Sequence, residues 1–445
     1  MEVLEKAPKP GWSQNLVAKG EPLKGAFFWL SAFYVVYCAR PEDWIPGLKY
    51  VPLAKISGIF ALLGIIVSAG KSKRSLRDLP TEAKYLAAMI GFLFLAGALS
   101  PVWQGGAIFK TLDFSKVLIA WVLTYVVVTN FDRLQKIIFI QSASVVLISI
   151  VSIAKGRHTA RLEGVIGGIY SNPNDLAFAI VLSFPFCMAF LLNSRRVLSK
   201  VLWLLSMLAM SFTLLLTASR GGFITLLGTG VVGLWHFGVK GKRMYLIGVA
   251  VFVAIVVGLT AGGRLKDRFL AISGGDLETG MEVSAHGSYE QRRYLMLKSV
   301  EAIEHYPLGI GFGNFPHYSG TWVQVHVAYL QITVEGGVGA LIFYLLFFRR
   351  GLKNLKPVLR AKDNDKETEL FSKALHCSLI GFLVGGIFAP EAYQYFPYFA
   401  VAYTSALLAL TKDKQREHLS GEEMPDRSRF GRKGKIRAGE LAPVR

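Results

Sequence analysis

The stretch "TWVQVHVAYLQITVEGGVGALIFYLLFF" (residues 321–348) runs from a polar loop into a long apolar segment and carries one histidine, His326, at the junction. Its apolar part is long enough to cross a hydrocarbon core about 30 Å thick as a helix. Similar segments recur along most of the 445 residues, of which 52% are hydrophobic and only 18% charged. Backbone polar groups have no water partner inside a bilayer, so helices are the expected spanning form. The composition therefore predicts an all-α polytopic membrane protein.

The apolar windows predict about twelve transmembrane helices. The first window follows a polar lead and has no clear cleavage site after it, so we interpret it as a membrane span and not as a signal peptide. The predicted spans lie near residues 25–39, 51–69, 85–102, 115–129, 137–154, 176–193, 199–217, 221–238, 244–262, 325–348, 371–389 and 395–411.

The distribution of basic residues predicts the orientation. If the N-terminal tail (residues 1–24) is cytoplasmic, the cytoplasmic segments hold about 35 of the 50 lysine and arginine residues, as the positive-inside rule requires. An even number of spans then leaves both termini in the cytoplasm. The tail from 412 to 445 is polar and poor in apolar residues, which predicts disorder.

Charge and cysteine content exclude several classes of function. The net charge of +20 does not indicate nucleic-acid binding, because the basic residues sit between apolar spans and do not gather on one folded face. Cys38, Cys187 and Cys377 lack the spacing of a metal site or redox pair, so we expect buried free thiols. The outer segments show no acidic cluster with metal-like spacing, and we expect no metal ion and no other cofactor.

One predicted outer loop, residues 263–324 between the ninth and tenth spans, is unusually long. Leu295, Leu297, Val300 and Ile303 recur within it at near-helical spacing, which predicts a short amphipathic helix folded over the outer mouth of the bundle.

Two shorter motifs predict turns. "GIGFGNF" (309–315) resembles a dinucleotide loop only superficially, because no strand precedes it, so we interpret its glycines as forming a tight turn. In "SNPNDLA" (171–177), Pro173 fixes φ at a helix start, and Asn174 or Asp175 is expected to cap the sixth span.

Positive charges on the outer side are informative because the positive-inside rule disfavours them. Arg161 lies in the outer loop before the sixth span, Arg220 in the minimal link "SRGG", and Arg292 and Arg293 at the start of the loop helix. Ionisable groups near membrane depth usually face the protein interior or an aqueous cavity. The alternatives are that Arg220 snorkels to lipid headgroups, that one of the paired arginines is a plain surface charge, and that His326 is structural.

Several outer arginines suit a phosphate or diphosphate, which guanidinium groups hold by bidentate, charge-assisted bonds. At a membrane surface, the natural candidate is a lipid diphosphate. If that diphosphate carries a sugar, it is already a good leaving group, and catalysis needs charge neutralisation and a base for the acceptor hydroxyl. A histidine, whose ordinary pKa is about 6.5, is suited to act as this base.

These motifs together resemble the O-antigen ligase and polymerase superfamily of bacterial glycosyltransferases. The resemblance rests on the span pattern, on the long loop and on four segments. His326, Leu330, Glu335 and Gly337 fit the family pattern His-Asn-x-x-Leu followed by Glu-x-Gly, whereas Val327 replaces its asparagine. The segments are "SNPNDLA", "SRGG", "QRRYLMLKSVEAIEHYPLGIGFGNF" and "HVAYLQITVEGGVGALIF". "CARPEDWIPGL" (38–48) also resembles the first outer loop of ligases associated with exopolysaccharide and exosortase systems.

The resemblance implies a GT-C-like membrane enzyme of the bacterial inner membrane, with its active site on the periplasmic side. Arg220 and Arg292 are then expected to hold undecaprenyl diphosphate, with Arg161 or Arg293 assisting, and His326 to activate the acceptor hydroxyl for inverting transfer. The acceptor would be lipid A core, a glycan or a protein. A polymerase of the same superfamily, a transporter or flippase of lipid-linked glycan, and a non-catalytic scaffold remain as alternatives.

Overall fold

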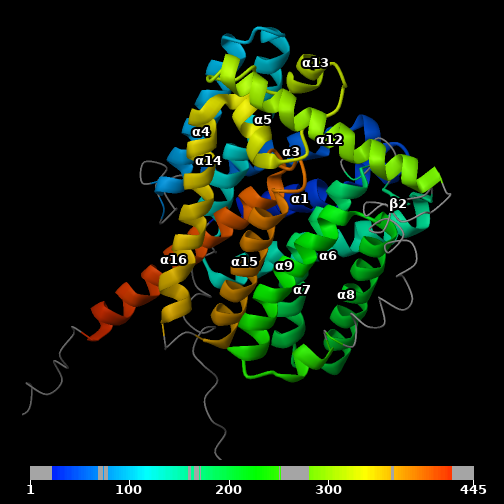
Figure 1. Ribbon diagram of the computed structural model, residues 1–445. Coiled ribbons are helices and arrows are strands. Elements are labelled where there is room, and N and C mark those ends of the chain that lie inside the picture. The colour runs from blue at the N-terminus through cyan, green and yellow to red at the C-terminus, as the bar shows by residue number, and fades with distance from the viewer. Residues whose placement is uncertain are drawn as a thin grey trace, which may run out of the picture.

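The computed structural model describes residues 23–68, 74, 79–158, 162–164, 170, 172–249, 251, 280–361 and 365–422. Over these residues the chain is a helical bundle with one pair of two-residue antiparallel strands (Figure 1). In chain order the elements are α1 (Lys24–Ala39), α2 (Pro41–Trp44), η1 (Leu48–Tyr50), α3 (Leu53–Val67), α4 (Thr81–Ala98), α5 (Gln104–Val127), α6 (Phe131–Lys155), β1 (Arg157–His158), β2 (Leu162–Glu163), α7 (Pro173–Asn193), α8 (Val197–Thr217), α9 (Arg220–Gly233), η5 (Leu234–Val239), α12 (Gly280–His305), α13 (Phe315–Ser319), α14 (Ala328–Arg360), α15 (Lys366–Gly385) and α16 (Tyr395–Glu422).

The prediction of a helical, multi-pass membrane protein is confirmed in its coarse form. Within the described residues, six helices are long and apolar enough to cross a membrane, fewer than the twelve or so spans predicted from sequence. They are α4, α6, α7, α8, α9 with η5, and α14, while α1 and α3 are shorter apolar helices. The predicted span 244–262 lies largely outside the described residues.

Several helices extend beyond the apolar windows that predict them. The window 115–129 belongs to α5, which already begins at Gln104, and the window 325–348 belongs to α14, which continues to Arg360. The added turns carry charged residues such as Lys110 and Asp113, and an apolar window cannot detect charged helical turns. α16 likewise continues past the predicted end of the last span, to Glu422.

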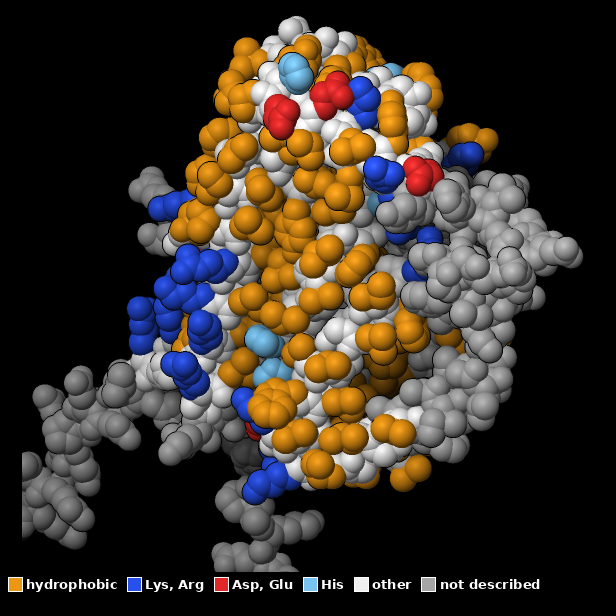
Figure 2. Space-filling view, in the orientation of Figure 1, with side chains coloured by type: hydrophobic (Ala, Val, Ile, Leu, Met, Phe, Trp, Pro, Cys, Tyr) orange, Lys and Arg blue, Asp and Glu red, His pale blue; other side chains and the backbone are white. Residues whose placement is uncertain are grey.

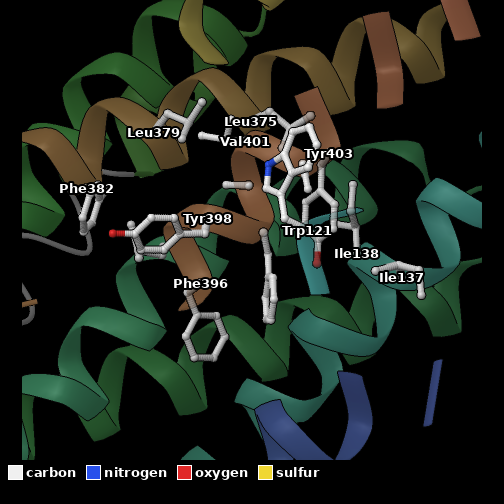
Figure 3. Packing of buried hydrophobic residues seen from close by; sticks show 14 of the residues in the cluster. Trp121, Ile137, Ile138, Leu375, Leu379, Phe382, Phe396, Tyr398, Val401 and Tyr403 are labelled. Carbon is white, nitrogen blue, oxygen red and sulfur yellow. The ribbon is translucent and has the colours of Figure 1, made fainter. Parts of the chain in front are cut away.

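Aromatic side chains fill the centre of the bundle (Figure 3). Trp121 of α5 and Tyr403 of α16 are both fully buried in the same cluster, which also includes side chains of α6 and α15. The buried phenol of Tyr403 donates a hydrogen bond to Oε1 of Gln141 at 2.8 Å, and Tyr34 shares one with Thr124 at 2.9 Å. The polar atoms of these two core tyrosines are thus satisfied, as burial requires.

The surface matches a membrane environment. Figure 2 shows hydrophobic side chains covering the middle of the displayed face, with acidic and basic side chains near its upper end and basic side chains toward its lower left. The outer face of α8 is exposed and apolar, with Leu198, Leu202 and Leu205 all more than half exposed. A contiguous apolar belt of this kind is suited to contact with lipid chains.

The long helix α14 is broken at Gly337, whose φ of 76° and ψ of 175° are not helical. Residues 307–311 pack against this break and supply the hydrogen bonds that the helix loses there. Ile310 and Gly311 donate their backbone N–H groups to the carbonyls of Val334 and Glu335 at 2.8 and 3.0 Å. In return, the Val338 N–H donates to the Pro307 carbonyl at 3.2 Å. The break and the loop therefore satisfy each other's backbone groups.

The "GIGFGNF" motif does form the tight turns predicted from its glycines. Gly309, Gly311 and Gly313 all have positive φ. Asn314 fastens the turn because its amide Nδ2 donates to the Ile310 carbonyl at 2.9 Å and to Oγ of Ser100 at 2.8 Å. These bonds join the loop to the segment between α4 and α5.

The predicted loop helix is present as α12, which is longer than expected and lies across the end of the bundle near α14 (Figure 1). Its predicted apolar face is partly wrong, because Leu297 is 62% and Val300 47% exposed. Leu295 is buried as predicted, in a small cluster that includes Val325 and Val334, and Ile303 packs against the same cluster. Ala302 and Ser299, which the spacing did not indicate, are buried as well. The spacing of apolar residues alone could not show that Ser299 and Ala302 complete the packed face, or that Leu297 and Val300 would be left outside.

Replacing Gly337 by alanine should destabilise the protein. Its backbone lies in a region that is nearly restricted to glycine, and an added Cβ would meet the Leu308 carbonyl carbon at 2.6 Å. We expect a loss of about 1–3 kcal/mol, measured as a lower melting temperature of the purified protein in detergent. Gly91→Ala in α4 is the matched control, because nothing lies within 4 Å of its added Cβ. Equal melting temperatures for the two variants would contradict the assigned role of the break.

Candidate active site

The two motifs "SNPNDLA" and "SRGG" meet in space at the N-terminal ends of α7 and α9. Oγ of Ser219 donates to Oδ1 of Asn174 at 2.8 Å and also accepts the Gly222 N–H at 3.1 Å, which caps α9. The two helix ends pack without space for a larger residue, because a Cβ on Gly222 would lie 2.6 Å from Cβ of Ala177. Arg220, the first residue of α9, is thereby fixed beside the start of α7.

The predicted cap of α7 is wrong by two or three positions. The side chain of Asn172 accepts the N–H of Asn174 at 3.0 Å, so Asn172 is the cap, and neither Asn174 nor Asp175 has this role. Pro173 occupies the first turn as expected. Because Asn172 is the cap, the Asn174 side chain is available for the contact with Ser219, and the Asp175 carboxyl for a contact with Glu391.

The link between α15 and α16, residues 386–394, lies between the start of α9 and the start of α14. On one side, a Cβ added to Gly221 would be 3.3 Å from Phe388. On the other, the Ala328 N–H donates to the Gly386 carbonyl at 2.7 Å, and the Ala392 N–H donates to Oε1 of Gln331 at 3.2 Å. Close neighbours of Arg220 and of His326 therefore contact the same short link, although the two residues are far apart in sequence.

His326 lies two residues before α14 and is half-buried. Its Nδ1 is 2.9 Å from the backbone carbonyl of Gln324. A carbonyl can only accept, so Nδ1 carries the proton of this bond. A neutral imidazole with its proton on Nδ1 has its lone pair on Nε2, and Nε2 is the atom that can act as a base.

A buried carboxylate holds the residue that orients His326. Glu335 of α14 is 0% exposed, and its Oε1 accepts a hydrogen bond from Nε2 of Gln324 at 2.8 Å. The same Gln324 offers its backbone carbonyl to His326. Gln324 was not recognised from sequence, since nothing in a loop sequence shows that its amide reaches a carboxylate eleven positions on. Glu335 is thus a positioning residue that acts through Gln324.

The paired arginines of α12 have different surroundings. Arg293 is exposed, whereas Arg292 is half-buried, three positions before the buried Leu295 and on the same side of the helix. Since Leu295 packs in a cluster with Val325, this side of α12 faces the segment that contains His326. Arg292 is the member of the pair that faces the bundle. Arg161 lies outside the described residues, so its predicted role remains a prediction.

Two carboxyl groups meet next to these elements. Asp175 of α7 and Glu391 of the α15–α16 link are close enough to share a hydrogen bond, and Glu391 is buried with 2% exposure. Burial, followed by the repulsion of Asp175, raises the pKa of Glu391 well above its ordinary value. The pair places the start of α7 beside the link that packs against Gly221 and accepts the N–H of Ala328.

Side chains that could bind a metal ion do not cluster in the described part of the chain. There, no three histidine, cysteine, aspartate or glutamate side chains gather as metal ligands. The three cysteines are buried and free, as the sequence predicts.

The geometry thus combines a half-buried arginine at the start of α9, another on α12, and an oriented histidine at the start of α14. Residues 205–345, which include all three, match the family model described as O-antigen ligase. The chain contains an O-antigen ligase family domain. No curated protein matches the chain. The family implies glycosyltransferase activity and lipid-linked glycan substrates. The matched region ends within α14, just after the break at Gly337.

The raised pKa of Glu391 predicts a pH-dependent stability. A buried carboxyl that resists ionisation loses stability as the pH rises from the ordinary value of 4.5 toward its raised pKa. Glu391→Gln cannot ionise, so its melting temperature should fall less than that of the wild type between pH 5 and 9. Thermal unfolding in detergent measures this, with the exposed Glu304→Gln as control. Parallel curves for wild type and Glu391→Gln would show that Glu391 is not held in its neutral form.

Proposed function

We propose that this protein transfers a glycan from undecaprenyl diphosphate to an acceptor hydroxyl at the periplasmic face of the inner membrane. The orientation of His326 carries the proposal. Its Nδ1 is bound to the Gln324 carbonyl, and Gln324 is itself held by the buried Glu335. A base whose reactive nitrogen is fixed by two successive contacts is what deprotonation of an incoming hydroxyl requires.

Arg220 and Arg292 are proposed to bind the diphosphate. Both are half-buried, and each sits on an element anchored close to His326: Arg220 at the α15–α16 link and Arg292 on the face of α12 that packs near Val325. Guanidinium groups that are partly shielded from water bind phosphate oxygens strongly. Arg293, being exposed, has no part in this proposal.

In the proposed step two bonds break and two bonds form. The acceptor O–H bond breaks and its proton passes to Nε2 of His326, while the acceptor oxygen forms a bond to the anomeric carbon of the glycan. The bond between that carbon and the diphosphate oxygen breaks, and the diphosphate leaves with its charge neutralised by the arginines. Attack from the face opposite the leaving group inverts the anomeric centre.

The paired arginines provide an internal test. Arg292→Ala should reduce glycan transfer by about 10²–10³-fold, because a charge-stabilising contact to the leaving group is lost. Arg293→Ala removes the same charge from the adjacent, exposed position and should retain near wild-type transfer. Transfer is measured with purified protein, lipid-linked glycan donor and acceptor. Full transfer by Arg292→Ala would remove this arginine from the proposed site.

A complemented deletion strain separates ligase from polymerase. We expect that His326→Ala leaves long polymer on the carrier lipid, with no transfer to lipid A core, glycan or protein. Carrier or core bearing only single repeat units would instead indicate a polymerase of the same superfamily. A glycan profile fully restored by His326→Ala would contradict the role of the histidine and favour a transporter.

A further inference from the structure

A cavity of about 1110 Å³ lies at the other end of the bundle from His326. Its walls come from the end of α9 with η5, the last turns of α14 and the beginning of α15. α14 carries His326 just before its start and Lys356 near its end, and at 1.5 Å per residue these positions are on the order of 40 Å apart. That distance is comparable to the thickness of a whole bilayer with its headgroups. The cavity therefore lies at the opposite membrane surface from the proposed active site.

Positive charge dominates the lining of this cavity. Lys240, Lys356 and Arg360 line it from two elements, and all three are exposed. Among the described lining residues Glu369 is the one acidic side chain, and it already pairs with Lys373 at 2.5 Å. The cavity thus carries an excess of cationic groups that an anion would balance.

A histidine pair, of which His236 is buried and His376 half-buried, forms the inner wall. Nε2 of His236 is 3.2 Å from Nδ1 of His376, and the two rings meet edge to face. His236 is 7% exposed, and its Nδ1 is buried without a hydrogen-bond partner among the described residues. A buried polar atom without a partner is costly, which indicates that something in the cavity completes its bonding.

The rest of the wall is apolar and continues onto the outside of the bundle. Val231, Trp235 and Leu359 line the cavity, and Val231 and Trp235 are exposed by 69% and 53%. Nζ of Lys240 lies 5.6 Å from the centre of the Trp235 ring. Figure 2 shows two adjacent histidine side chains on the displayed face, surrounded by hydrophobic side chains with basic side chains close by. Tryptophan and lysine in this arrangement are typical of the level of lipid headgroups.

We infer that this cavity binds an anionic membrane phospholipid. The phosphate group faces Lys240, Lys356, Arg360 and the buried ring of His236, and an acyl chain lies along Val231, Trp235 and Leu359. A soluble anion would not need the apolar wall, and a zwitterionic lipid would not balance the basic groups. The inference is independent of the glycan transfer proposed above, because it concerns the opposite end of the bundle.

Native mass spectrometry of the purified full chain tests this inference. Phosphatidylglycerol and phosphatidylcholine with the same acyl chains are added separately to the delipidated protein. We expect the wild type to retain one phosphatidylglycerol more tightly than phosphatidylcholine, and Lys356→Gln/Arg360→Gln to bind phosphatidylglycerol about tenfold more weakly, because charge-assisted bonds are lost. The matched control is Arg349→Gln/Lys353→Gln, which removes two exposed charges from the same helix at positions that do not line the cavity.

A second variant, His236→Phe, keeps a ring of similar size and removes the buried polar atom, and it should also weaken phosphatidylglycerol binding. Equal binding by the two double variants would overturn the inference. So would equal retention of both lipids, which indicates an apolar groove alone. Displacement of the lipid by millimolar inorganic phosphate would indicate a site for a free anion, and preferential displacement by undecaprenyl phosphate would indicate a site for the carrier lipid. Either result would also contradict it.

Discussion

The break in α14 at Gly337 is the constraint on which the candidate site depends. A helix that is interrupted near a membrane leaves backbone N–H and carbonyl groups that must find partners inside the protein. Residues 307–311 provide them through bonds to Val334, Glu335 and Val338. The loop before α14 is thereby fixed to the helix itself, and α12, which leads into that loop, is fixed with it.

Two sets of contacts follow from this arrangement. Next to the break, the buried Glu335 holds Gln324, and Gln324 orients His326. At the start of α14, the Gly386 carbonyl accepts the Ala328 N–H, which ties the histidine segment to the α15–α16 link. That link also packs against Gly221, the neighbour of Arg220. Groups from three distant parts of the chain are thus held by hydrogen bonds and close packing, and a site built in this way tolerates little movement.

Local signals in the sequence predicted part of this site. Apolar windows predicted most of the long helices, and the rarity of positive charge on the predicted outer side singled out four arginines: Arg161, Arg220, Arg292 and Arg293. The family resemblance then favoured His326. Contacts between remote segments could not be predicted, because Gln324 with Glu335 and Asp175 with Glu391 depend on packing. The exposure of Leu297 could not be predicted for the same reason, because the elements that pack on α12 decide which of its sides is buried. The helix cap was misplaced because three neighbouring polar residues are all suitable.

We propose that Arg220, Arg292 and His326 surround one lipid diphosphate. The most direct test is an electron cryo-microscopy structure of the protein in a lipid nanodisc with undecaprenyl diphosphate bound. We expect phosphate oxygens within hydrogen-bonding distance of both guanidinium groups, with Nε2 of His326 facing the space beside the ester oxygen that would carry the glycan. A diphosphate bound away from both arginines, for instance in the cavity beside His236, would contradict it.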